Sequence, residues 1–341
     1  MQSNTHSCIR NRTPQFPLAR SLRPCYSRRA AQAVIAALLT VLLFALSAIC
    51  GRRVTEMMDS LCANAIRLVL AAAALGLLAA LTAPAITPRP ALLWLLLSGV
   101  VGFGIGDAGL FLAYPRIGSR LTVLIYLCLA PLFAAAGEWL WLGQTLTLPE
   151  SFVLALILFG VAFALSGPIH LREHRSTFLA GSLWAVVAGL GQGFGGVLSR
   201  QAELAANDLG ASVPALQQAF QRCLGGLGFA LLLLLAVRFS LPPAQRRVWT
   251  AGRPHPLTFT LWLTAAALFG PVFGVTCFQW ALLEIGNSAI VQAMVSTTPI
   301  ALIPLAWRLE KDRPTGRSIA GSLVAVAGVV LLCLLQGQAL A

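Results

Sequence analysis

The sequence predicts an all-α integral membrane protein of ten transmembrane helices, arranged as two inverted five-helix repeats. Three observations predict this fold class: an apolar composition, ten apolar runs and an internal repeat. Of the 341 residues, 58% are hydrophobic and only 10% are charged. The mean hydropathy of +0.81 lies outside the usual range of soluble globular chains. Water is therefore not the main solvent of this protein.

The apolar runs provide the ten predicted helices. A bilayer core about 30 Å thick needs about 20 residues per helix. The runs fall near residues 33–50, 61–82, 91–114, 121–142, 150–168, 178–198, 213–237, 258–283, 289–308 and 317–336. The first run is as long as its successors, which favours a retained membrane helix over a signal or transit peptide.

The runs divide the chain into three segments. Residues 1–32 hold six arginines and three prolines without a helical period, which predicts a disordered basic tail. Residues 33–170 and residues 178–336 each hold five runs, and we expect them to form the first and second repeat.

An internal repeat relates the two halves. One constant shift in numbering aligns rare residue types without a gap, and a second, shorter shift aligns the second helix of each half. The first shift pairs Gly102 with Gly270, Gly106 with Gly274, Pro131 with Pro299 and Trp139 with Trp307; the second pairs Arg67 with Arg222. Because five is odd, the two repeats must insert in opposite orientations, as in many secondary transporters whose solute site lies near the midplane.

Charge and cysteine usage exclude other classes. The net charge of +13 comes from arginines in the tail and the loops, so membrane topology explains it better than nucleic-acid binding. The basic odd-numbered loops and the basic tail predict opposite orientations in the membrane, which leaves the orientation open. Eight scattered cysteines show no metal-ligand spacing, and His170 and His174 lack a third ligand. We expect no metal, no cofactor and no nucleic-acid partner.

With these residues in view, the chain resembles the EamA type of the drug/metabolite transporter (DMT) superfamily over roughly residues 33–336. The resemblance rests on doubled motifs around the fourth and ninth helices and on the early arginines. These are Pro131-Leu132-Phe133 with Trp139-Leu140-Trp141-Leu142-Gly143, Pro299-Ile300 with Trp307 and Glu310, the Ile-Gly loops after the third and eighth helices, and Arg67 and Arg222. The family implies transport of small metabolites with no enzymatic step. The family's Gly-Glu pair is Gly143-Gln144 here and Lys311-Asp312 in the second half.

Charged groups inside a bilayer are costly, so each one needs an explanation. Asp107 and Arg67 are predicted at similar depth on antiparallel helices, where they approach each other or face one cavity. In the functional interpretation Asp107 exchanges a proton or binds a cationic group, and Arg67 modulates the pKa of Asp107. An ion pair that only holds two helices together is an equally good alternative. Glu138, beside Trp139, reads as an interfacial glutamate, with a gating or coupling role as the alternative.

Polar residues of the second half predict a substrate cavity. Position 275 holds valine where the first half has Asp107. The polar residues of the second half cluster instead on the seventh helix. The expected cavity residues are Arg222, Gln217, Gln218, Gln221, Gln279 and Gln292, with Gln192 as a further candidate. Amides offer both a donor and an acceptor, which suits polar solutes, although interhelical hydrogen bonding explains any single one equally well.

Four glycines and two prolines are assigned structural roles. Gly102, Gly106, Gly270 and Gly274 form matched small-residue patterns that predict close helix packing. Pro131 and Pro299 are predicted to kink the fourth and ninth helices.

The sequence thus predicts a multi-pass secondary transporter of a bacterial cytoplasmic (inner) membrane, exporting an amino acid or similar polar metabolite by alternating access, with drugs as further candidate substrates. We expect partners limited to the lipid bilayer, a small-molecule substrate and a proton as coupling ion, in a monomer or homodimer. The absence of a GxxxxGK[ST] loop excludes a built-in ATPase. The alternatives are a membrane enzyme or flippase acting on lipid-linked substrates, and a non-transporting membrane subunit.

Overall fold

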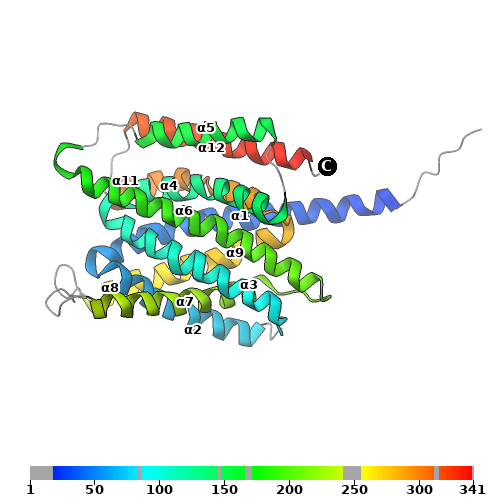
Figure 1. Cartoon of the computed structure of the whole chain (residues 1–341), viewed down its shortest axis with the longest axis horizontal. Coiled ribbons are helices and arrows are strands. Elements are labelled where there is room, and N and C mark those ends of the chain that lie inside the picture. The colour runs from blue at the N-terminus through cyan, green and yellow to red at the C-terminus, as the bar shows by residue number, and fades with distance from the viewer. Residues whose placement is uncertain are drawn as a thin grey trace, which may run out of the picture.

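A computed structural model describes the backbone of residues 18–82, 86–143, 147–165, 171–240, 255–310 and 315–339. Within these ranges the chain forms helices and no strand. The helices lie side by side in one elongated bundle (Figure 1). Residues 1–17 of the predicted tail, Gln144, and the Lys311-Asp312 pair lie outside the described ranges.

Long runs of Ala, Leu and Val explain the helices, because in lipid every backbone polar group must be satisfied within the segment itself. The first helix, α1, already begins at Leu18, inside the segment predicted as a tail. The elements are α1 (Leu18–Met57), α2 (Ser60–Thr82), α3 (Arg89–Gly99), η1 (Val100–Gly106), α4 (Asp107–Leu142), α5 (Leu148–Leu165), α6 (Leu171–Asn207), α7 (Ala215–Ser240), α8 (Pro256–Ala267), η3 (Leu268–Val272), α9 (Phe273–Ile285), α10 (Ser288–Val295), α11 (Thr298–Glu310) and α12 (Gly316–Ala339).

Seven segments of the described chain are long and apolar enough to cross a membrane. They are Gln32–Met57, Ser60–Thr82, Arg89–Trp141, Ser176–Asn207, Ala215–Ser240, Pro256–Ile285 and Ser288–Leu309. Large apolar side chains such as Leu77, Leu232 and Phe239 are exposed on the outside of the bundle, as expected of a surface that faces lipid tails. The chain is therefore a multi-pass membrane protein.

The longest of these segments reverses direction at Gly118. This residue has φ of 77° and ψ of 167°, a conformation that is essentially restricted to glycine. The contacts with α6 run antiparallel before Gly118 and parallel after it. They join Gly109 to Ala188 and Gly102 to Gly195 before the reversal, and Tyr126 to Gly189 and Ala130 to Gly193 after it. Residues 89–141 therefore contain two antiparallel arms.

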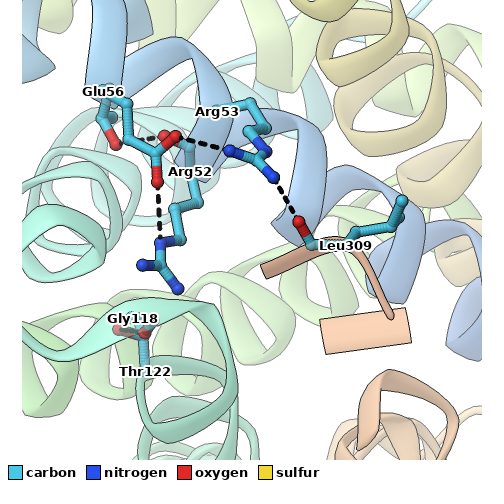
Figure 2. A network of polar contacts seen from close by, with 7 residues as sticks. Arg52, Arg53, Glu56, Gly118, Thr122 and Leu309 are labelled. Carbon is cyan, nitrogen blue, oxygen red and sulfur yellow. Dashed lines mark hydrogen bonds and ion pairs between the residues drawn. The ribbon is translucent and has the colours of Figure 1, made fainter. Parts of the chain in front are cut away.

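Arginine side chains at the end of α1 lie beside this reversal (Figure 2). Arg52 Nε lies 3.3 Å from Glu56 Oε1, and a methyl group on Gly118 would lie 3.1 Å from Arg52 Nη1. Arg53 donates to Glu56 Oε2 at 3.0 Å and to the carbonyl of Leu309 at the end of α11. One turn of α1 thus ties together the ends of α4's first arm and of α11.

Two short π-helical segments interrupt the helices at corresponding places. The first, η1, begins at Val100, and the second, η3, begins at Leu268. The shift that pairs Gly102 with Gly270 in the sequence also pairs these two starting residues. Gly286, the counterpart of Gly118 under the same shift, also has a positive φ, of 69°.

The two aligned prolines differ in their structural effect. The helix continues through Pro131, whereas α10 ends at Val295 and Pro299 lies in the first turn of α11. Proline is tolerated in a first turn because its missing N–H has no helical partner there. Instead of the kink predicted at Pro299, the helix is interrupted just before this residue.

Candidate functional site

A cavity in the middle of the bundle is the candidate site. Water molecules can occupy about 40 Å³ of it, and the gaps between its walls, part of them open to solvent, add up to about 480 Å³. Its walls come from α1, α2, η1, α4, α6, η3 and α9, so both halves contribute. The polar side chains that line it belong to Ser47, Arg67, Asp107, Tyr114, Tyr126 and Gln192.

An ion pair between α2 and α4 forms one side of this cavity. Arg67, which is only 3% exposed, donates through Nη2 to Asp107 Oδ2 and, at 3.0 Å, to Asn64 Oδ1. Its guanidinium also lies 4.6 Å from the centre of the Phe111 ring. The structure therefore brings Arg67 and Asp107 together, as their predicted depth on antiparallel helices requires.

The second-half arginine, Arg222, has a different environment. Its Nη1 donates to Gln279 Oε1 at 2.8 Å, and Gln279 Nε2 donates to Gln218 Oε1 at 2.7 Å. Gln218 in turn donates to the carbonyl of Val213 at 3.0 Å. The three side chains form a buried polar chain that connects α7 and α9.

Each arginine lies against a glycine of the other half. A methyl group on Gly270 would lie 3.1 Å from Arg67 Nη1, and one on Gly102 would lie 3.1 Å from Arg222 Nη2. Gly102 and Gly270 therefore make room for guanidinium groups inside the two π-helical segments. This is a more specific role than the helix packing that the sequence predicts.

The other two matched glycines do pack helices closely. A methyl group on Gly106 would lie 3.1 Å from the Cα of Gly191 on α6. The same group on Gly274 would lie 2.8 Å from the ring of Phe44 on α1. A larger residue at either position would push the neighbouring helix away.

The remaining predicted amides separate into two groups. Gln292 donates to the carbonyl of Gln192 at 2.7 Å and accepts from the Gln192 side chain at 3.3 Å, so it positions a residue of the cavity wall. Gln221 instead donates to Thr87, before the start of α3, and Gln217 is half-buried on α7. None of the six residues predicted to line the cavity is in its wall: neither Gln217 and Gln221 nor Arg222, Gln218, Gln279 and Gln292.

Glu138 lies inside the protein and not at its surface. It is buried, and its Oε1 accepts from the backbone N–H of Ser288 at 2.8 Å and from its hydroxyl at 2.9 Å. The carboxylate thus binds the first turn of α10, where the helix dipole favours negative charge. The sequence did not predict this contact, because the partner lies far away in the chain and leaves no local pattern. The interfacial depth of Glu138 in the membrane stays a prediction.

Two further hollows open at the ends of the bundle. One is lined by residues where α6 ends and α7 begins, the other by residues where α1 ends and α2 begins. The first comprises Glu203, Ala206, Asn207, Ser212, Val213, Gln218, Leu283 and Glu284, and the second comprises Thr55, Met58, Asp59, Ser60, Leu112, Pro115, Arg116 and Thr177. We call them the α6–α7 vestibule and the α1–α2 vestibule. Their empty volumes are about 730 and 790 Å³.

The sequence analysis missed four residues of the site. Ser47, Tyr114 and Tyr126 line the cavity, and Phe111 lies against Arg67. Single hydroxyl and aromatic residues in apolar runs carry little signal by themselves. Phe111 could have been found one helical turn after Asp107, on the same face. Among the described residues, no group of three His, Cys, Asp or Glu side chains is placed to hold a metal ion.

Comparisons with known proteins agree with this architecture. The sequence profile described as EamA-like transporter family matches residues 31–166 and again residues 179–334. A crystal structure described only as that of a protein is similar in fold, with a TM-score of 0.62 at 18% identity over 90% of this chain and 98% of the other. A search of curated proteins found no match. Since the two profile matches together span most of its length, the chain belongs to the EamA-like transporter family of the DMT superfamily.

Proposed function

We propose that this protein is a secondary transporter that exports a small polar metabolite across a bacterial cytoplasmic membrane by alternating access. The solute is moved without a chemical reaction. Ten membrane-crossing helices form the carrier, as two five-helix repeats of opposite orientation that enclose the central cavity.

One observation carries this proposal: three hollows succeed one another along the single helix α6. Thr177 lines the α1–α2 vestibule, Gln192 lines the central cavity and Glu203 lines the α6–α7 vestibule. At 1.5 Å per residue, Thr177 and Glu203 are about 39 Å apart along the helix. This span matches the thickness of a bilayer with its headgroups. A polar cavity lies midway between two openings on opposite sides of the membrane.

The opposite orientation of the repeats is supported by equivalent features at opposite ends. The shift that pairs Gly102 with Gly270 takes Pro115 and Arg116 of the α1–α2 vestibule onto Leu283 and Glu284 of the α6–α7 vestibule. It also takes the reversal at Gly118 onto Gly286. Equivalent loops that open toward opposite faces are expected when an odd number of helices is duplicated.

Asp107 is the group we assign to proton coupling. It is the carboxylate among the residues lining the central cavity, and its side chain keeps 16% exposure, while its partner Arg67 keeps 4%. A carboxylate that alternates between an ion pair and a protonated form links proton movement to solute movement. Tyr126 lines the same cavity and offers a hydroxyl near this exchange.

Flux measurements test the proposal directly. The purified protein is reconstituted into sealed vesicles and given a panel of labelled amino acids and related metabolites, with and without a pH gradient. We expect saturable flux of at least one solute that rises with the gradient, and loss of that pH dependence in Asp107→Asn. Absence of flux for every solute, while the protein remains folded, contradicts the assignment as a carrier.

Access from two sides is tested by labelling single cysteines. In a background without native cysteines, Thr177→Cys and Ser212→Cys place one thiol in each vestibule, both at positions that are not buried. We expect a membrane-impermeant maleimide added outside sealed vesicles of uniform orientation to label only one of them. Equal labelling of both from one side contradicts the alternating-access proposal.

A further inference from the structure

Arg222 is a buried cation whose main partner is neutral. The residue is 3% exposed, it donates to the amide oxygen of Gln279, and its Nε has no hydrogen-bond partner. Among the described residues no carboxylate lies within ion-pair distance of it. A guanidinium removed from water without a counterion is strongly unfavourable. This position therefore favours the binding of an anion.

Comparison with Arg67 shows what is missing. Arg67 contacts Asp107 and, one turn later, Phe111. The equivalent positions on α9 hold Val275 and Gln279, and Gln279 is the residue that Arg222 binds. The second half thus keeps the arginine but has valine and an amide at the positions of the acid and of the aromatic ring. The rings that Arg222 does contact, Phe103 at 5.5 Å and Phe278 at 6.0 Å, are farther from its guanidinium than Phe111 is from that of Arg67.

Arg222 is also within reach of both the vestibule and the cavity. The chain of hydrogen bonds from Arg222 through Gln279 ends at Gln218, which lines the α6–α7 vestibule. On its other side, Arg222 Nη2 lies beside Gly102, which lines the central cavity and has no side chain to shield the guanidinium. Arg222 therefore lies between residues that line the two hollows.

From these contacts we infer that Arg222 binds a carboxylate of the transported solute, which displaces the side-chain oxygen of Gln279 as its partner. The two arginines and Asp107 leave one surplus positive charge, which a solute with one carboxylate neutralises. The freed amides of Gln279 and Gln218 can donate to the same carboxylate. The inference rests on the proposed function and names the chemical class of its solute.

Binding to the purified full-length protein in detergent tests the inference without requiring transport. The probes are matched pairs in which only the charge differs: butyrate and butyramide, L-leucine and L-leucinamide, L-phenylalanine and L-phenylalaninamide. Chloride and inorganic phosphate serve as simple anions. We expect at least one carboxylate to raise the melting temperature in a dose-dependent way, while its amide and the two inorganic anions do not.

Substitutions then locate the binding site. Arg222→Gln is expected to weaken the carboxylate effect about tenfold or more. Val275→Asp is expected to do the same by supplying a fixed counterion, whereas Val275→Asn, of equal size and no charge, retains binding. Arg308→Gln removes an exposed arginine from the end of α11 and serves as a matched control. The Val275 pair keeps the test valid if Arg222→Gln does not fold.

Several results overturn the inference. These are equal stabilisation by acid and amide, an effect of the inorganic anions alone, no effect of any carboxylate, and undiminished binding in Arg222→Gln or Val275→Asp. Flux of a neutral or cationic solute that is indifferent to these substitutions defeats the inference and leaves the carrier assignment intact. Carboxylate binding without flux of any solute supports the inference about Arg222 but contradicts the assignment as a carrier.

Discussion

The two halves of this protein share a frame and differ in the chemistry that the frame carries. Both have an arginine on the second helix, a π-helical segment and a glycine with positive φ at matching positions. In the first half the arginine is neutralised by Asp107, whereas in the second half it is bound by Gln279. The two halves thus share these backbone features, while the partners of the two arginines differ.

A third correspondence, visible in the structure, extends the shared frame to the first helix of each half. Arg52 of α1 lies beside Gly118, and Arg200 of α6 lies beside Gly286. Arg52 pairs with Glu56, as Figure 2 shows, and Arg200 pairs with Glu203 at 3.2 Å. An arginine–glutamate pair therefore lies beside both positive-φ glycines.

Removal of the first-half acid is expected to have the largest effect on stability. Asp107→Ala leaves Arg67 buried without a counterion, which costs about 3–5 kcal/mol in comparable buried pairs. Thermal unfolding of the purified protein in detergent measures this loss. Glu56→Ala, which breaks two partly exposed pairs with Arg52 and Arg53, should cost less than about 1 kcal/mol per pair.

A double variant checks the cause of that effect. Arg67→Ala combined with Asp107→Ala should cost clearly less than the sum of the two single changes, because the second removes a charge that the first left unpaired. Simple additivity would show that the two residues contribute separately, and the contrast between the halves would then lose its electrostatic basis.

A difference in helix crossing between the halves comes next in magnitude. A methyl group on Gly99 would lie 1.9 Å from the carbonyl oxygen of Arg222, so Gly99→Ala must separate α3 from α7. The expected cost is about 2–3 kcal/mol. The counterpart of Gly99 in the second half is Ala267, which is already buried as alanine, so the crossing there has room for a Cβ. Equal melting temperatures of Gly99→Ala and the parent protein would contradict this difference.

Substitution of the positive-φ glycines should have a smaller effect than Gly99→Ala, in the same direction in both halves. Gly118→Ala is expected to cost about 2 kcal/mol and Gly286→Ala about 1 kcal/mol. Residues other than glycine rarely adopt the backbone conformation of Gly118, whereas that of Gly286 is left-handed helical and costs them less. Melting curves of the two variants test the order. Gly228→Ala, on a helix with open space around it, should be neutral or stabilising. A destabilising effect in one half only would break the equivalence of the reversals.

Much of the fold follows from features that the sequence states locally. Apolar runs mark the helices, and the constant shift between the halves locates both the matched glycines and the counterpart of Gly118. Antiparallel threading of two adjacent helices is enough to place Arg67 near Asp107. These predictions succeed because each needs only the pattern of apolar residues along the chain, the spacing between the repeats, or two helices that are adjacent in sequence.

The rest depends on contacts between distant segments. Arg67 lies over Gly270 and Arg222 over Gly102, which requires knowing how the halves interlock. Gln221 turns to Thr87, away from the cavity, although it follows the same helical spacing as Gln218. The π-helical segments leave hydropathy unchanged, so no pattern of apolar residues reveals them.

Each π-helical segment also fixes the direction in which the next helix presents its side chains. A π-turn accommodates one residue more than an α-turn, so it rotates the downstream helix by about 100° about its own axis relative to an uninterrupted helix. Asp107 is the first residue after η1. The azimuth of this carboxylate is therefore set by the seven residues before it, and deleting one of them would aim the acid at a different neighbour without altering the chemistry of any side chain in the cavity.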